Sequence, residues 1–190
     1  MWSLADSGAA RLNGASERAI LRAAQDGSEA AVEELFRRHW SATHRAAYLI
    51  VRDGTAAEDI AQEAFLSALA ALDRFDRRRP FAPWLHRIAV NRAIDWSRTR
   101  SARREVASGE QVIDAATEQP PGRVELEAGG EVEAALAGLS AEHRAVVILR
   151  YLLDYTPGEI SRMLDLPRGT INSRLRRALD RLSGSLGESS

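Results

Sequence analysis

Two short helical patterns separated by a tight turn, near the C-terminus, constrain the fold more than any other feature of this chain. Residues 156–182 read TPGEISRMLDLPRGTINSRLRRALDRL. Thr156, Pro157 and Glu159 have the spacing of an N-cap, a first helical position and a capping box. Apolar residues then recur at helical intervals on both sides of an interruption at residues 166–169. The pattern predicts a helix-turn-helix, although an ordinary helical hairpin with a solvated basic face would share it.

The second helix of this pair has an apolar stripe and a basic, polar face. The stripe consists of Ile171, Leu175, Ala178, Leu179 and Leu182. In helix-turn-helix proteins the second helix enters the major groove of DNA, where arginine reads guanine and asparagine reads adenine. Arg174 is nearer the packing side, so we expect it to contact phosphate. The candidate DNA contacts lie away from the stripe and are Arg168, Asn172, Ser173, Arg176 and Arg177.

Charge is distributed unevenly along a chain whose formal net charge is only −1. Residues 76–104 contain nine arginines and two aspartates, a net charge of +7. Residues 105–142 contain nine acidic residues and one arginine, a net charge of −8. Residues 143–182 contain eight arginines and four acidic residues, a net charge of +4. Two basic blocks around an acidic connector are typical of a protein that contacts nucleic acid at two separate places.

Composition excludes several classes of function. There is no cysteine, which excludes disulfides, thiolate metal sites and cysteine nucleophiles. No apolar run approaches the roughly 20 residues of a membrane span, and the first residues do not form a secretory signal. We therefore expect a cytoplasmic protein without membrane insertion. The four histidines lack zinc spacing, and no phosphate loop or Ser-His-Asp pattern is present, so we expect no metal, no cofactor and no catalysis.

Helical periodicity without strand alternation predicts an all-α protein of two small helical domains joined by an acidic flexible linker. Within the first domain, Ser28 is placed to cap the second helix, and Thr55 with Glu58 to form a capping box at the third. Residues 76–83 are expected to be an irregular loop. Ser140 is placed to cap a helix before the helix-turn-helix. The expected boundaries are a flexible N-terminus over 1–15, a helical domain over 16–104, the linker over 105–130 and the helix-turn-helix domain over 131–184.

Two further motifs lie in the first domain. Asp59, Gln62 and Glu63 are spaced i, i+3 and i+4, which places them on one helical face, although most such clusters are simply solvated. Residues 81–91 read FAPWLHRIAVN and are followed by Asp95 and Arg98. We interpret the two tryptophans of this region, Trp84 and Trp96, as core residues because aromatic side chains at helical spacing usually pack inside. His86 is a possible surface contact.

Together these segments resemble the extracytoplasmic-function (ECF) group of sigma-70-type transcription initiation factors. The pieces that carry the resemblance are EDIAQEAF over 58–65, FAPWLHRIAVN over 81–91, Asp95 with Arg98, and GTINSRL over 169–175. The resemblance covers about residues 16–104 and 131–184. It implies a non-enzymatic factor that binds core RNA polymerase through its β′ and β subunits and directs promoter recognition, DNA melting and transcription initiation. It also implies a possible anti-sigma factor as a partner.

The resemblance assigns roles to individual residues. Asp59, Gln62 and Glu63 would dock on a coiled coil of the β′ subunit. An unpaired, flipped-out base of the −10 promoter element would need a pocket with apolar walls and polar groups, and the residues that would bind it and the strand around it are Pro80, Phe81, Asn91, Asp95 and Arg98. Further phosphate contacts would come from Arg77, Arg78, Arg79, Arg92 and Arg100. The −35 element contacts would be Arg168, Asn172, Ser173, Arg176 and Arg177.

The chain departs from the family pattern in the turn, where Asp165 replaces the usual glycine. Asn172 also stands where many members have a basic residue, so the preferred bases cannot be transferred. The alternative is a helix-turn-helix regulator whose N-terminal block is a sensor or dimerisation domain. A regulator has no need for both the Asp59 face and the segment over 81–91. A nucleic-acid enzyme is a third class, which the lack of clustered carboxylates, metal ligands or a nucleophile disfavours.

Overall fold

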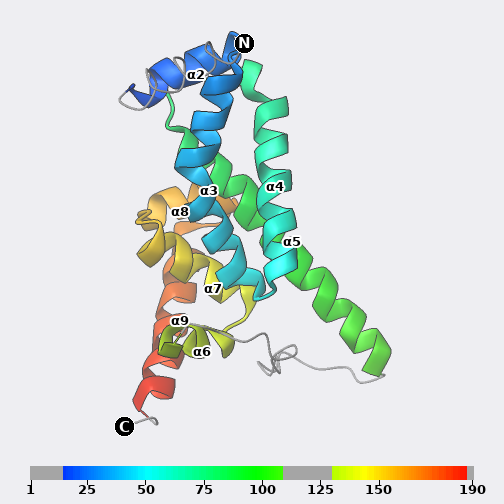
Figure 1. Cartoon of the computed structure of the whole chain (residues 1–190). Helices are drawn as coiled ribbons and strands as arrows, with labels where there is room; N and C mark the ends of the chain where they lie inside the picture. The colour runs from blue at the N-terminus through cyan, green and yellow to red at the C-terminus, as the bar shows by residue number, and fades with distance from the viewer. Residues whose placement is uncertain (1–14, 109–129, 188–190) are drawn as a thin grey trace.

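Every regular element in the described part of the chain, residues 15–108 and 130–187 of the computed structural model, is a helix. The all-α prediction is therefore confirmed (Figure 1). The N-terminal block contains α2 (Glu17–Gln25), α3 (Glu29–Val51), α4 (Gly54–Ala70), the short η1 (Leu72–Arg74) and α5 (Phe81–Ser108). The C-terminal block contains α6 (Gly130–Ala137), α7 (Ala141–Val147), η2 (Ile148–Leu152), α8 (Pro157–Leu164) and α9 (Arg168–Gly187). The expectations for residues 1–14 and for most of the acidic linker lie outside the described residues.

Polar side chains at the helix starts satisfy backbone N–H groups that would otherwise lack a partner. The side chains of Ser28 and Ser140 cap α3 and α7, as predicted. The cap of α4 differs from the prediction: Asp53, not Thr55, accepts a hydrogen bond from the backbone N–H of Ala56 at 3.1 Å. Helix α4 begins at Gly54, so Thr55 already lies inside the first turn and cannot act as the N-cap.

Helix α5 begins at Phe81, inside the segment that was expected to be a loop. Pro83 lies in its first turn, where the missing N–H of proline removes no helical hydrogen bond. The helix then continues unbroken for 28 residues, which corresponds to a rod about 42 Å long. Its early start moves the Phe81 side chain into the core, where it is fully buried.

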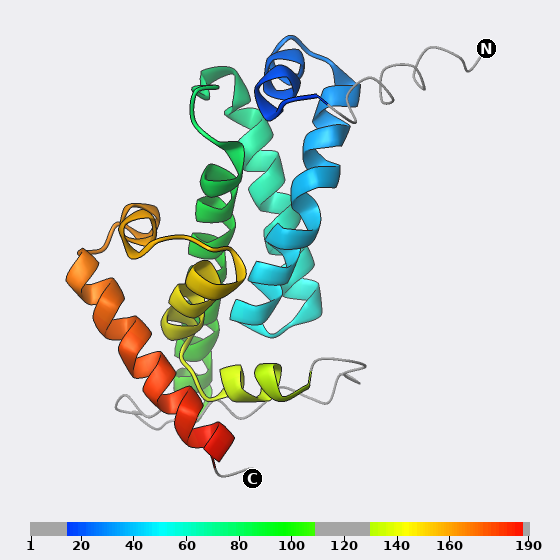
Figure 2. The ribbon, with the colours of Figure 1, turned by 90° about the vertical axis from the view of Figure 1, so that its left-hand side faces the viewer.

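Two clusters of buried apolar side chains hold the helices together. One lies entirely within the N-terminal block and includes Ile20, Leu35 and Phe65. The other spans both blocks, because Val90 and its neighbours from α3 and α5 pack together with Ile160 and its neighbours from the C-terminal helices. The two blocks therefore share one continuous core. Figure 2 shows α7 beside α5, with α9 on the outer side of α7.

Buried polar contacts reinforce the junction between the blocks. Arg144 on α7 is 1% exposed, and its guanidinium donates hydrogen bonds to the carbonyl oxygens of Ile50 at 2.8 Å and of Leu139 at 2.7 Å. Nδ1 of His86 and the hydroxyl of Tyr155 are hydrogen-bonded at 2.7 Å. Because an unpaired buried polar group costs about 1–3 kcal/mol, these bonds favour this particular docking of the blocks.

Candidate nucleic-acid interface

Helices α8 and α9 form the predicted helix-turn-helix. Oγ1 of Thr156 accepts from the N–H of Glu159 at 3.3 Å, and the Glu159 carboxylate accepts from the N–H of Thr156 at 2.8 Å. The hydrogen bonds from Thr156 lower the pKa of Glu159. Asp165 ends α8 in the left-handed conformation, at φ 54° and ψ 45°. Aspartate tolerates this region better than most residues, which explains how it can replace the usual glycine.

The face of α9 that sequence periodicity assigned to DNA is open to solvent. Arg168, Asn172, Arg176 and Arg177 are exposed, whereas Ser173 is half-buried and donates its hydroxyl hydrogen to Thr170. On the opposite face Ile171, Leu175 and Ala178 are buried, as predicted. Leu179 was expected in the buried stripe but is 41% exposed, so that part of the prediction is wrong. Arg174 is half-buried, which agrees with its expected place near the packing side.

The three polar residues predicted to share a face of α4 do so. Asp59, Gln62 and Glu63 are exposed, while Ile60 and Phe65 on the other side of the helix are buried. The Gln62 amide donates to the Glu58 carboxylate at 3.2 Å. The exposure of this acidic face is thereby confirmed, and its contact with a polymerase stays a prediction.

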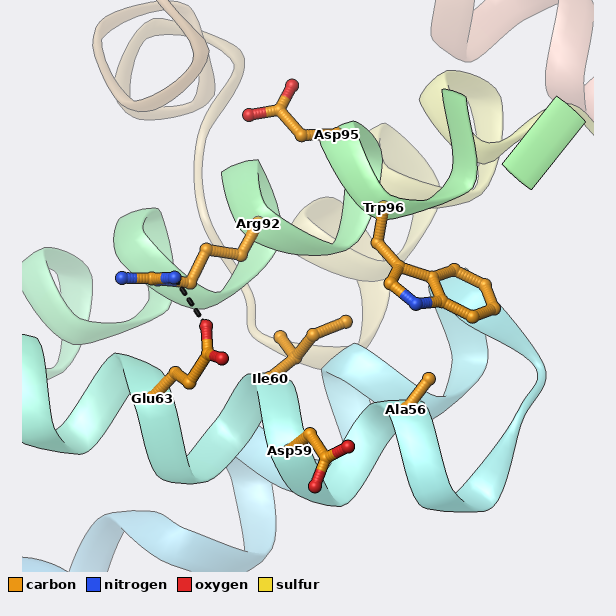
Figure 3. A pocket seen from close by; sticks show the side chains of 7 residues that line it. All are labelled: Ala56, Asp59, Ile60, Glu63, Arg92, Asp95 and Trp96. Atoms are coloured by element: carbon orange, nitrogen blue, oxygen red, sulfur yellow. Dashed lines mark hydrogen bonds and ion pairs between the residues drawn. The ribbon is translucent and has the colours of Figure 1, made fainter. Parts of the chain in front are cut away.

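A shallow pocket of about 330 Å³ lies between α4 and α5, and it joins two groups of candidate residues that are far apart in sequence. Figure 3 shows Arg92 and Trp96 extending from α5 towards α4, with Asp95 at the rim pointing away from α4. The acidic face of α4 and the residues of α5 assigned to the −10 element are therefore adjacent. The residues that line the pocket are Ala56, Asp59, Ile60, Glu63, Arg92, Asp95 and Trp96.

The other residues assigned to the −10 element differ in their exposure to solvent. Pro80, Asp95 and Arg98 are exposed, and Asn91 is half-buried one helical turn before Asp95. Phe81 is fully buried, and its ring packs against other aromatic rings at centroid distances of 5.3–5.9 Å. Its side chain is therefore not available to a base in this structure, so the expectation of a loop residue that contacts DNA is corrected.

His86 is also buried, so the expectation of a surface contact is wrong. Its side chain is 5% exposed and lies at the junction of the two blocks. Burial, assisted by the positive charge that His39 can carry, lowers the pKa of His86 to about 4. Burial likewise raises the pKa of its partner, Tyr155. Both groups are neutral at pH 7, as a buried hydrogen-bonded pair requires.

Three arginines of α5 form ion pairs with carboxylates of other segments. Arg92 forms an ion pair with Glu63 (Figure 3). It also donates to the Ser67 hydroxyl at 2.9 Å. Nε of Arg98 donates to Glu142 on α7 at 2.8 Å. The Arg100 guanidinium is 2.7 Å from Asp53 and lies over the ring of Trp96, 4.8 Å from its centroid.

Sequence reasoning missed the residues that join the two blocks. Glu142, Arg144 and Tyr155 contact residues far away in sequence, so no local motif marks Glu142 or Tyr155. Arg144 carried a weak signal, because it lies one turn after Ala141 and before Ile148 on a helical face that is otherwise apolar.

Comparison with known proteins decides the family. The family model described as "Sigma-70 region 2" matches residues 35–103, and the family model described as "Sigma-70, region 4" matches residues 129–182. The ECF RNA polymerase sigma factor SigM of Mycobacterium tuberculosis is 35% identical over 172 residues, covering 90% of this chain and 85% of SigM. The chain belongs to the ECF sigma-70 family. ECF sigma factor SigW of Bacillus subtilis is 34% identical over 140 residues, covering 68% of this chain and 75% of SigW.

Solved structures of this family share the fold. The structure of CnrH in complex with the cytosolic domain of CnrY matches with a TM-score of 0.66 and 29% identity, covering 92% of this chain and 99% of that one. The matched part, 92% of this chain, is longer than either helical block alone, so the similarity includes both blocks. The sigma factor RpoE of Bartonella quintana, in complex with the anti-sigma factor NepR, matches with a TM-score of 0.64 at 24% identity, which supports the fold alone.

This ECF sigma factor is a transcription initiation factor that works with core RNA polymerase on promoter DNA. The alternative was a regulator whose N-terminal block is a sensor or dimerisation domain. The match of this block to region 2 argues against it. Among the residues described, no helix has the length and apolar character to cross a membrane, and no group of three potential metal ligands occurs.

Proposed function

We propose that this sigma factor divides promoter recognition between its two helical blocks, with boundaries close to residues 16–104 and 131–184. Helix α4 docks on core polymerase through Asp59, Gln62 and Glu63. Helix α5 then holds an unpaired base of the −10 element with Asn91 and Asp95, while Arg98 contacts the backbone. Helix α9 reads the −35 element through Arg168, Asn172, Ser173, Arg176 and Arg177.

The observation that carries this proposal is the adjacency of the two N-terminal surfaces. Glu63 on α4 and Arg92 on α5 are ion-paired, and Asp59 and Asp95 line the same pocket. A polymerase element that binds α4 would therefore lie next to the DNA strand that α5 holds. Acidic side chains exposed on a helix would steer and orient a basic partner.

The proposal extends to the cellular setting and to a protein partner. A factor that acts on RNA polymerase works in the cytoplasm and needs no catalytic centre of its own. CnrH was solved with the cytosolic domain of another protein bound to it. By analogy, we infer that a protein partner of the anti-sigma type binds this chain.

Asp59→Arg and Asn91→Ala together test the division of labour. Asp59→Arg should abolish capture by core polymerase, because it reverses the charge of the docking face. Asn91→Ala should leave capture unchanged and slow open-complex formation on duplex promoter DNA more than on a pre-melted template, by about tenfold for one lost base contact. The control is Asp73→Arg, the same charge reversal at an exposed site on η1.

Two outcomes would contradict the proposal. Capture of the Asp59→Arg protein at the wild-type level would remove α4 from the polymerase interface. Equal behaviour of the Asn91→Ala protein and the wild type on duplex promoter DNA would remove α5 from base recognition.

A further inference from the structure

Two arginines on the promoter side of α5 are held by carboxylates that come from elsewhere in the molecule. Glu63, on the polymerase face of α4, pairs with Arg92. Glu142, on α7 of the C-terminal block, pairs with Arg98. Both arginines are candidates for contact with promoter phosphates. In this closed arrangement, in which the two blocks pack together, each guanidinium already has an anionic partner, and that of Arg98 also lies 3.9 Å from the Asp95 carboxylate one turn before it.

Glu142 is held in place by the packing of the C-terminal block. It is two residues before Arg144, whose buried guanidinium bonds to the carbonyl oxygen of Ile50 on α3. Partial burial raises the pKa of Glu142, but the hydrogen bonds from Arg98 and from the backbone outweigh it and leave the pKa lowered. Glu142 is therefore a carboxylate at neutral pH and a fixed counter-ion for Arg98.

This closed arrangement cannot persist on a promoter. The positions −10 and −35 are about 25 base pairs apart, or about 85 Å of duplex at about 3.4 Å per base pair. A compact chain of this length has a radius of gyration of about 16 Å, which corresponds to a sphere about 40 Å across. This is about half of the span, so α5 and α9 cannot reach both elements at once. The blocks must separate, and their separation removes Glu142 from Arg98.

We propose that Glu63 and Glu142 are internal counter-ions that compete with DNA phosphates for Arg92 and Arg98, and that this competition ends when polymerase binds the α4 face and the C-terminal block moves away. The inference rests on the proposed function, because it takes α5 as the promoter side of the N-terminal block. Both ion pairs are open to solvent on the arginine side, with 40% of the Arg92 side chain and 59% of the Arg98 side chain exposed, so a phosphate can reach each guanidinium once its carboxylate has left. The chain thereby couples polymerase binding, opening and DNA binding through the same two arginines.

Glu142→Gln tests the inference without polymerase, because it removes the charge and keeps the size of the side chain. The measurement is binding of the free full-length protein to a fluorescent single-stranded oligo(dT) at several salt concentrations. The matched control is Glu58→Gln, which removes the same charge from an exposed residue of α4 that bonds to Gln62. We expect Glu142→Gln to bind about fivefold more tightly than Glu58→Gln. Its affinity should also fall more steeply with salt, by about 0.7 in the logarithmic slope, as one added phosphate contact requires.

The double variant Arg98→Ala with Glu142→Gln should lose the whole gain. Equal affinities of the Glu142→Gln and Glu58→Gln proteins would overturn the inference, and so would a gain that survives in the double variant. If Glu142→Gln gains affinity but the chain fails the capture test with core polymerase, the counter-ion role stands and the proposed function falls.

Separation of the blocks is measured independently with a pair of dyes. The absence of native cysteine allows Ser41→Cys on α3 and Ser183→Cys on α9 to be labelled specifically, and both positions are exposed. We expect high energy transfer in the free protein and a large loss once polymerase and promoter DNA are bound. Unchanged transfer efficiency in the two states would overturn the opening step.

Discussion

Helices α5 and α9 both carry arginines assigned to DNA, but they present them differently. On α9, Arg168, Arg176 and Arg177 are exposed and form no ion pair within residues 15–108 and 130–187. On α5, Arg92, Arg98 and Arg100 each pair with a carboxylate from another helix or loop. Under the proposed function, the arginines of α9 are therefore open to DNA in the free chain, whereas those of α5 must first exchange their partners.

The difference follows from where the two helices pack. Helix α5 lies between the two blocks and contacts α3 and α4 as well as α7 and α8, so acidic residues on its neighbours can reach its arginines. Helix α9 packs on α6, α7 and α8 and leaves its other side open. The arginines of the helix at the junction thus meet carboxylates of its neighbours, whereas those on the open side of the peripheral helix do not, among the residues that the structure describes.

Arg144→Met should have the largest effect, because it weakens the junction of the two blocks that distinguishes α5 from α9. The variant keeps much of the apolar packing but leaves the carbonyl oxygens of Ile50 and Leu139 without their buried donor. We expect the free energy of unfolding to fall by about 3 kcal/mol, measured by urea denaturation. The same change at Arg162, an exposed residue of α8, should alter it by less than about 0.5 kcal/mol. A loss below about 1 kcal/mol for Arg144→Met would show that the junction does not depend on this guanidinium.

Acid should weaken the junction next most strongly, because His86 lies between the blocks. Its pKa is about 4 in the folded chain against about 6.5 unfolded, so between these pH values the unfolded chain binds a proton that the folded chain does not. Stability contributed by neutral His86 is therefore complete above pH 6.5 and is lost as pH falls, by about 2 kcal/mol at pH 5. Burial also lowers the pKa of His39 and of His143, which adds loss in the same direction.

His86→Gln should flatten this pH dependence in thermal or urea unfolding between pH 8 and pH 5. His44→Gln, at a half-buried site on α3, serves as the matched histidine control and should leave the dependence intact. A His86→Gln protein with the wild-type pH profile would contradict the assignment.

Substitutions of the exposed residues of α9 should have the smallest effects on free energy. They sharpen the comparison with α5, because Asn172 and Arg176 form no ion pair in the described part of the chain that would have to be broken first. Asn172→Ala or Arg176→Ala should lose about 1.5 kcal/mol of discrimination at individual −35 positions. Arg174→Ala should weaken all sequences alike and reduce the salt slope by about 0.9 if it contacts phosphate. The measurement is binding to single-base-substituted −35 duplexes at two salt concentrations. A uniform loss for the Asn172 and Arg176 variants would mean that α9 only clamps the backbone.

Sequence reasoning succeeded where the signal is local. The capping box at Thr156 and Glu159, the buried face of α9 around Ile171, and the exposed face of α4 all follow from spacing along one helix. The residue-level contacts with polymerase and DNA stay predictions, because they depend on molecules outside the chain.

Two of the errors, at Phe81 and His86, occurred where tertiary contacts decide the outcome. The local pattern predicts a loop at Phe81, but an aromatic cluster with Phe75 and Trp84 makes burial more favourable. The local pattern predicts a surface position for His86, but a partner 69 residues away in sequence buries it. No window of sequence contains both members of such a pair, so periodicity could not identify the shared core.

The unbroken length of α5 has a mechanical consequence. Arg98 lies 17 residues after the start of the helix, which places it about 25 Å along a stiff rod. If polymerase tilted that rod by about ten degrees around its first turn, Arg98 would travel about 4 Å, because a straight helix transmits rotation along its whole length. That travel exceeds the 2.8 Å separation between Arg98 and Glu142. Under such a tilt, helix α5 would convert a small rotation at one end into a broken contact far along it.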